Sequence, residues 1–129
     1  MSYITQAHLE ARYGADEILR LADRDGDSIP DTDVLNAAIG DAGEVIDSHL
    51  AGRFTLPLDP VPGVILRLAC SIARYHLYDE APTRHVSDEY RAAVSALEKI
   101  ASGELRLARP DGGPDYTEGE RQFNDIGEY

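Results

Sequence analysis

The sequence predicts a mainly α-helical protein: a small helical bundle of two short N-terminal helices and three longer helices, with a minor β element and an extended C-terminal arm. Two observations predict this fold class. A chain of 129 residues suits one domain with one core. Apolar residues recur three and four positions apart over most of the chain before the arm, which is the period of a helix with one buried face. We therefore expect a helical domain at residues 1–108 and an extended arm at residues 109–129.

The first two helices are short and are marked by their end residues. Thr5 is a typical N-cap before "QAHLEARY", because its hydroxyl can accept a hydrogen bond from a free N–H of the first turn. Gly14 is expected to close this helix, since glycine tolerates the backbone conformation that follows a helix C-terminus. The next stretch, "ADEILRLA", carries Ile18, Leu19 and Ala22 on one side and predicts a second short helix.

A longer helix is predicted at residues 32–52, with Asp31 or Thr32 as its cap. Three acidic residues at three-residue steps, Asp41, Glu44 and Asp47, form a stripe on one side. Its buried face is formed by apolar residues at helical spacing: Val34, Leu35, Ala38, Ile39, Ala42, Ile46 and Leu50.

Prolines separate this helix from the next one. The connector "RFTLPLDPVPG" contains Pro57, Pro60 and Pro62, so it is expected to be rigid. A fourth helix is predicted from about residue 62 to 80, and a fifth is expected to follow the cap Ser87 and to end at Gly103.

A minor β element is expected at residues 55–58 and 104–108. The first segment precedes and contains a proline, which favours extended backbone. The second, "ELRLA", alternates apolar and polar residues, as a short strand does.

Residues 109–129 are rich in glycine, proline and acidic side chains and lack a helical period. Apolar residues nevertheless recur through this arm, and such spacing is typical of a segment that anchors on another protein. The candidate partner-binding residues of the arm are Tyr116, Arg121, Phe123, Ile126 and Tyr129.

Two arginines of the fourth helix, Arg67 and Arg74, lie seven positions apart on one face. They are candidate receivers for the carboxylates of a neighbouring copy. The same pattern is equally typical of a solvated helix face, so both interpretations stay open at this point.

The net charge of −12 bears on the class of partner. An acidic chain gains nothing from neutralising phosphates, so affinity for nucleic acid is disfavoured. Acidic surfaces instead suit a cation, a basic partner or a channel wall past which DNA moves without sticking. Arg67, Arg74 and His76 interrupt the longest apolar region, so no membrane contact is expected. The lack of a secretory signal and the single cysteine, Cys70, predict synthesis and folding in a reducing cytoplasm.

No catalytic motif is present, so an enzyme is not indicated and no catalytic residue or cofactor is predicted. The sequence contains no HExxH, GxSxG, GxGxxG or Walker pattern. Cys70 falls near the buried side of a helix, where cysteine is normally an inert small hydrophobe.

The stretch "LADRDGDSIPDTDVL" raises the question of calcium. Calcium prefers six to eight oxygen ligands, and a calcium loop normally closes with a bidentate carboxylate. Position 12 of this loop is Val34, and Ser28 replaces the usual glycine. The same residues are good turn chemistry, which is the favoured interpretation. The four aspartates that fit ligand positions 1, 3, 5 and 9 are Asp23, Asp25, Asp27 and Asp31.

Several segments together resemble the small acidic virion protein of Mu-like phages and prophages. Members carry an aspartate-rich turn, a "DA…ID.YL..RY.LPL" segment and "RLACDIARYRLYD", and their tail commonly ends in Arg-x-Phe followed by a final aromatic. Here Phe54 and Ser71 depart from the pattern, which has tyrosine and aspartate there. The matching positions are Asp41–Ala42, Ile46–Asp47, Leu50, Arg53–Phe54, Leu56–Pro57–Leu58, Arg67 through Asp79, Arg121-Gln122-Phe123 and Tyr129.

The resemblance implies a head–tail connector, or adaptor, in the neck of a tailed phage virion. Such proteins are similar to helical adaptors that form a ring, here expected to hold twelve copies, beneath the portal protein. A stopper or tail-terminator protein is expected on the other side, and double-stranded DNA passes through the lumen without specific binding. The acidic stripe of Asp41, Glu44 and Asp47 is then a candidate lining of that channel.

Two alternatives from other classes stay open. One is a calcium-binding helical module that uses the Asp23–Asp33 loop. The other is an acidic DNA mimic that occupies a basic, nucleic-acid-binding protein.

Overall fold

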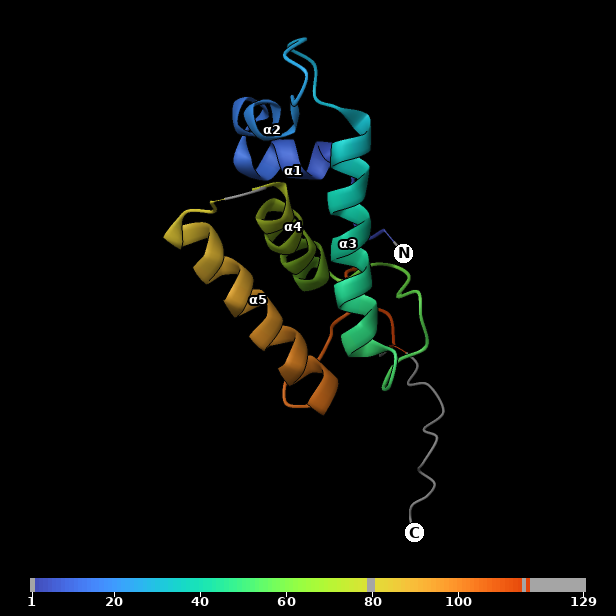
Figure 1. The fold of residues 1–129 in the computed structure, drawn as a ribbon. Helices are drawn as coiled ribbons and strands as arrows, with labels where there is room; N and C mark the ends of the chain where they lie inside the picture. The colour runs from blue at the N-terminus through green and yellow to red at the C-terminus, as the bar shows by residue number, and fades with distance from the viewer. Residues whose placement is uncertain (1, 79–80, 115, 117–129) are drawn as a thin grey trace.

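The computed structural model describes residues 2–78, 81–114 and 116. These residues form five helices, which confirms the mainly α fold class (Figure 1). The helices are α1 (Gln6–Tyr13), α2 (Ala15–Ala22), α3 (Thr32–Leu50), α4 (Gly63–Leu77) and α5 (Arg84–Ser102). No helix within the described part of the chain is long and apolar enough to cross a membrane.

The two short helices have the bounds that their end residues predict. The Thr5 hydroxyl accepts a hydrogen bond from the backbone N–H of His8, and the His8 ring accepts one from the Thr5 N–H at 2.9 Å. Gly14, with φ of 93°, ends α1 and donates its N–H to the Glu10 carbonyl. The positive φ is available to glycine at no steric cost, so the chain turns there directly into α2.

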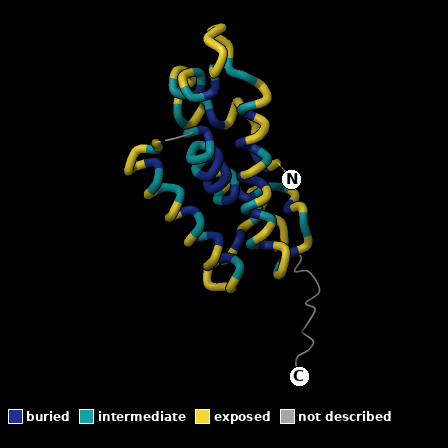
Figure 2. The backbone as a smooth tube through the Cα atoms, in the orientation of Figure 1, coloured by how far each residue is buried: buried dark blue, intermediate teal, exposed yellow. Residues whose placement is uncertain are grey.

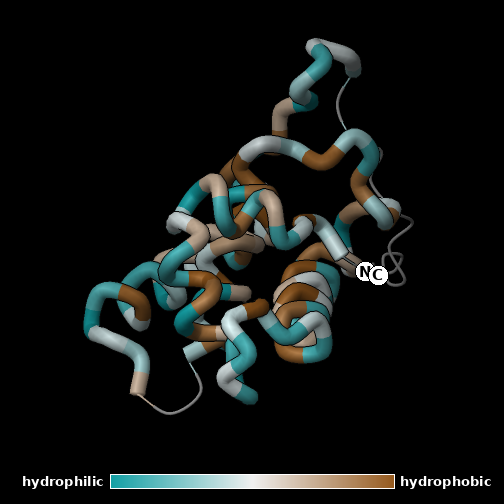
Figure 3. Tube along the Cα trace, turned by 90° about the horizontal axis from the view of Figure 1, so that it is seen from above, coloured by the Kyte–Doolittle hydropathy of each residue, from teal (hydrophilic) through white to brown (hydrophobic). Residues whose placement is uncertain are grey.

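Helix α4 is the centre of the core. It packs against α3 and α5 along its length and also touches α1. Figure 2 shows its backbone as a largely buried segment between helices that are exposed on their outer sides. Seen from above, apolar and polar residues alternate around the helices, as expected for amphipathic helices with one buried face (Figure 3). The fully buried aliphatic residues include Leu9, Ile18, Leu35, Ile46, Leu50, Ile65, Ile72, Leu77, Leu97 and Ile100.

The start of α5 differs from the expectation. Thr83, and not Ser87, is the N-cap, and its hydroxyl accepts a hydrogen bond from the Val86 N–H at 3.2 Å. The additional turn buries Val86 in the hydrophobic interior. Because Ser and Thr are both good caps, the apolar residue three positions after Thr83 decides between them.

The prediction of a minor β element at residues 55–58 and 104–108 is wrong, because neither segment forms a strand. Among the described residues, only Phe54 occupies an isolated bridge position, and residues 55–58 and 104–108 contain no strand. Pro57 has no N–H to give to a ladder. Leu58 and Leu107 are instead buried in the core, so these segments are held by side-chain packing.

The packed part of the chain does not end at the expected boundary between residues 108 and 109. Tyr116 is buried, and its hydroxyl donates a hydrogen bond to the Pro60 carbonyl. The Arg109 guanidinium lies 5.6 Å from the Tyr116 ring centroid and pairs with Asp111 at 3.0 Å. Tyr116 therefore contributes to the fold.

Candidate partner-binding surfaces

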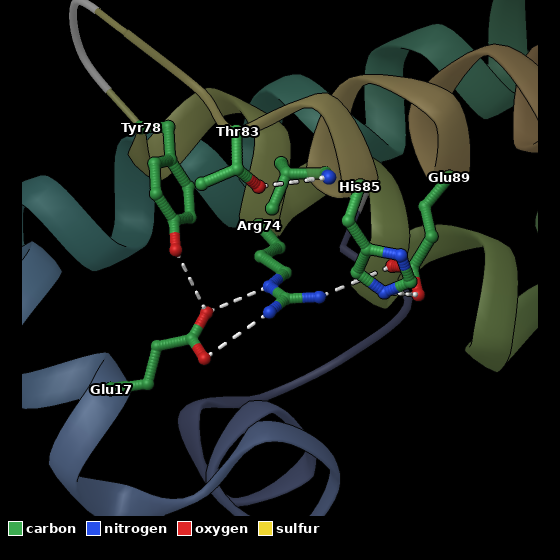
Figure 4. A network of polar contacts seen from close by, with 7 residues as sticks. Glu17, Arg74, Tyr78, Thr83, His85 and Glu89 are labelled. Carbon is green, nitrogen blue, oxygen red and sulfur yellow. Dashed lines mark hydrogen bonds and ion pairs between the residues drawn. The ribbon is translucent and has the colours of Figure 1, made fainter.

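Arg74 lies at a polar joint between three helices (Figure 4). Its guanidinium donates two hydrogen bonds to Glu17 of α2, at 2.7 and 3.2 Å, and one to Glu89 of α5 at 3.4 Å. It also lies 4.2 Å from the ring centroid of Tyr13. Only 12% of the Arg74 side chain is exposed. Arg74 is therefore used within the chain, which corrects the expectation that it receives a neighbouring copy.

The Glu17 carboxylate fixes the charge state of this joint. Burial lowers the pKa of Arg74, but the hydrogen bond and the charge of Glu17 outweigh this and raise it above its usual value. Tyr78 adds a hydrogen bond from its hydroxyl to Glu17 at 3.3 Å. The joint therefore holds α2 and α5 on the same end of α4.

Arg67 has a different environment, although it lies only two turns earlier on α4. It is exposed, and no ion pair of Arg67 is present among the described residues. It lines an open groove between α1 and α4 with a volume of about 350 Å³, which we call the α1–α4 groove. The lining residues of this groove are His8, Ala11, Arg12, Gly63, Leu66, Arg67 and Cys70.

The charged side chains that line the α1–α4 groove are cationic. Arg12 and Arg67 are exposed cations. His8 accepts the Thr5 N–H at Nδ1, which places the proton of the neutral ring on Nε2. Burial raises the pKa of Cys70, with Arg12 opposing, so the thiol stays neutral. No acidic residue belongs to the described lining of the groove.

Only part of the acidic stripe on α3 is exposed to solvent. Asp41 and Glu44 are exposed, whereas Asp47 is half-buried and accepts a hydrogen bond from the Tyr3 hydroxyl. Burial, followed by the contact with Asp47, raises the pKa of Tyr3. As a candidate channel lining, the stripe therefore consists of Asp41 and Glu44, while Asp47 fastens the N-terminal segment to α3.

The aspartate loop brings together the four residues named from the sequence. One carboxylate oxygen from each of Asp23, Asp25, Asp27 and Asp31 lies within 4.8 Å of the others. Asp33 does not belong to this group, so it does not close the loop as a fifth ligand.

Most of these carboxylates already accept hydrogen bonds from the loop itself. Asp23 accepts the N–H groups of Gly26 and Ser28, both at 2.9 Å, and Asp31 accepts that of Arg24 at 3.0 Å. Desolvation raises the pKa of Asp23, but these backbone N–H groups lower it below its usual value. The loop is thus a turn closed by hydrogen bonds to its own aspartates.

The remaining arm residues lie outside the described part of the chain. They are Arg121, Phe123, Ile126 and Tyr129, and their role stays a prediction. Tyr116 is the one candidate residue of the arm that the structure describes. It is buried against Pro60 and is not an exposed anchor.

Sequence reasoning missed His8 and Arg12 of the groove, and Glu17 and Glu89 of the joint. Each lies on a different helix from the arginine it accompanies, 15 to 57 residues away where a hydrogen bond joins them. The sequence does contain one indication of a cationic surface on α1, because the first turn of this helix carries no acidic residue and its last turn carries Arg12.

The fold and these surfaces define a small acidic helical domain with a cation-lined groove between α1 and α4. The chain matches the family described as "Bacteriophage Mu, Gp36" over residues 3–125. It is 36% identical over 104 residues to "Gene product J" of Escherichia phage Mu, a match that covers 80% of this chain and 74% of that protein. It is 42% identical over 77 residues to the "Mu-like prophage FluMu protein gp36" of Haemophilus influenzae, which covers 60% of this chain and 55% of that protein. The chain belongs to the Bacteriophage Mu Gp36 family of Mu-like phage proteins.

Proposed function

We propose that this protein is a structural component of the virion neck, a head–tail adaptor that docks as a ring beneath the portal protein. The ring holds twelve copies by resemblance to helical adaptors. It contacts a stopper or tail-terminator protein on its other side. DNA passes through its lumen during packaging and ejection, and the chain carries out no reaction.

The observation that carries this proposal is the family match, which spans nearly the whole chain and makes it a Mu-like phage protein. Assembly suits its size, because a small helical domain has much surface for its core and gains stability by association.

The distribution of charge gives further support. Asp41 and Glu44 are exposed on α3, so this face repels DNA phosphates. A lumen of that kind lets DNA slide without retaining it.

Removal of the protein tests the proposal. A phage that lacks this gene is expected to produce DNA-filled heads and separate tails that do not join, both visible by negative-stain electron microscopy. Supplying the wild-type gene in trans restores joined particles and controls for damage to neighbouring genes. Joined, infectious particles without the protein would refute the adaptor role.

A further inference from the structure

We propose that the α1–α4 groove binds the C-terminal segment, residues 117–129, of a second copy of this chain. This inference rests on the proposed function and names the contact that joins neighbouring subunits. The segment lies outside the described residues, so its composition and the groove itself carry the argument.

Charge complementarity is the first reason. The groove presents Arg12 and Arg67, and no acidic residue is found in its described lining, although the chain as a whole has a net charge of −12. The segment 117–129 contains one arginine and four acidic residues, Glu118, Glu120, Asp125 and Glu128. Arginines that face solvent on an otherwise acidic chain are the natural receivers of such a segment.

The N-terminus of α4 adds to the positive electrostatic potential of the groove. Gly63, its first residue, lines the groove, and a side chain placed there would meet open space. The first turn of α4 contains no acidic residue, and its N-cap, Pro62, makes no capping hydrogen bond through its side chain. The positive end of the helix is therefore open to a carboxylate from another chain.

Apolar surface is the second reason. Ala11, Leu66 and Cys70 give the groove an apolar lining between its cations. The segment carries Phe123, Ile126 and the terminal Tyr129 among its acids. A groove of about 350 Å³ accommodates one or two such side chains.

Ring symmetry is the reason for a second copy. A closed ring of identical subunits requires two different, complementary surfaces on each subunit. The groove and the segment are such a pair. The segment starts beside Tyr116, which is fixed to Pro60, and its thirteen residues can span at most roughly 45 Å. That length reaches across a neighbouring domain of this size.

Disulfide trapping between two differently marked chains tests the contact. One chain carries Ala11→Cys in the groove and the other carries Ile126→Cys in the segment, both in a Cys70→Ala background that is first shown to enter particles as the wild type does. Both chains are supplied together to the phage, and particles are purified, oxidised and separated on a non-reducing gel. We expect a linked pair of chains, because residues 11 and 126 come together only between copies in this mixture. Ala92→Cys, exposed on α5, replaces Ala11→Cys in the control mixture and is expected to give no pair.

The second measurement reverses a charge in the groove. Incorporation into particles is measured with Cys70 present, and the linked fraction is measured in the cysteine variants described above. Arg67→Glu is expected to lower both the linked fraction and incorporation by about tenfold. Arg84→Glu, an exposed arginine of α5, is the matched control and is expected to change neither.

The contrary outcomes are distinct. If the chain is present in particles but no 11–126 link forms, or Arg67→Glu has no effect, the inference is wrong and the adaptor role stands. A third sample contains one chain that carries both Ala11→Cys and Ile126→Cys. If a link forms only within that chain, the segment binds its own groove and the inference is also wrong. If the protein is absent from particles altogether, the adaptor role fails and this contact fails with it.

Discussion

At the scale of single residues, Arg74 is the polar side chain on which the arrangement of helices depends. Its guanidinium is shared between Glu17 of α2 and Glu89 of α5 and stacks on Tyr13 of α1. Removing one member of such a partly buried network leaves the remaining charges without their partner, which costs more than the pair itself contributes.

Arg74→Ala is therefore expected to lower the free energy of unfolding by about 2–3 kcal/mol. Urea titration followed by circular dichroism measures the change. Arg67→Ala, on the same helix but exposed, is the matched control and should stay within about 0.5 kcal/mol of the wild type. Equal effects of the two substitutions would show that the joint does not stabilise the fold.

Tyr3 gives the fold an alkaline limit. Burial and the nearby Asp47 raise its pKa above the usual value of about 10, so the folded state favours the protonated phenol. A raised pKa contributes stability that is complete below the unfolded value and is lost as pH rises through the folded value. The contribution of Tyr3 is thus complete at neutral pH, begins to fall at about pH 10 and is lost progressively as pH rises further toward the raised pKa of the folded state.

Tyr3→Phe removes this titration. Between about pH 9 and 11 the urea midpoint of the variant should fall less steeply than that of the wild type. Part of the slope should remain, because burial also raises the pKa of Tyr13. Parallel curves for the two proteins would contradict the assignment to Tyr3.

At the scale of structural elements, the aspartate loop projects from the end of the bundle between α2 and α3 (Figure 1). Ser28 has a φ of 67°, which is unfavourable outside glycine, and its N–H donates to Asp23 at 2.9 Å. Ile29 beside it is 63% exposed. Backbone N–H groups that donate to the Asp23 carboxylate hold this conformation.

Calcium at millimolar concentration is accordingly expected to leave the melting temperature unchanged within about 1 °C, because the ion must compete with backbone N–H groups for incomplete ligands. Differential scanning fluorimetry with magnesium as the matched salt measures this. A rise of several degrees that disappears in Asp25→Ala would favour the calcium-binding module instead.

How far the elements follow from the sequence depends on how local their causes are. α1 and α2 are predicted to the residue, because Thr5 and Gly14 determine both ends of α1 and the start of α2 through neighbouring backbone groups. The choice of Thr83 over Ser87 depends on burying Val86, which is a tertiary effect. The expected strands are absent from residues 55–58 and 104–108, where Leu58 and Leu107 are buried in the core and Pro57 has no N–H to give to a ladder.

The candidate site shows the same division more sharply. The sequence pattern does not distinguish Arg67 from Arg74. In the structure Arg67 lines an open groove, whereas Arg74 is enclosed between helices. What separates them is Glu17, which lies 57 positions from Arg74 in the chain. Periodicity places residues on one face of a helix but does not say which helix covers it.

At the scale of the whole molecule, the distribution of charge over the surface is the property that bears on the proposed assembly. The chain is strongly acidic, and its surface carries an acidic face on α3 and a cation-lined groove between α1 and α4. In the proposed ring the α3 face lines the lumen, and the groove with the C-terminal segment of a neighbouring copy forms the pair of different, complementary surfaces that a closed ring requires. The adaptor proposal rests on this property together with the family match.

Locating the protein in the assembled virion tests the adaptor role most directly. Cryo-electron microscopy of particles, with symmetry applied only around the neck, should resolve a ring of five-helix subunits between the portal and the first tail component. Copies found along the tail tube, in the head shell or nowhere in the particle would contradict the account.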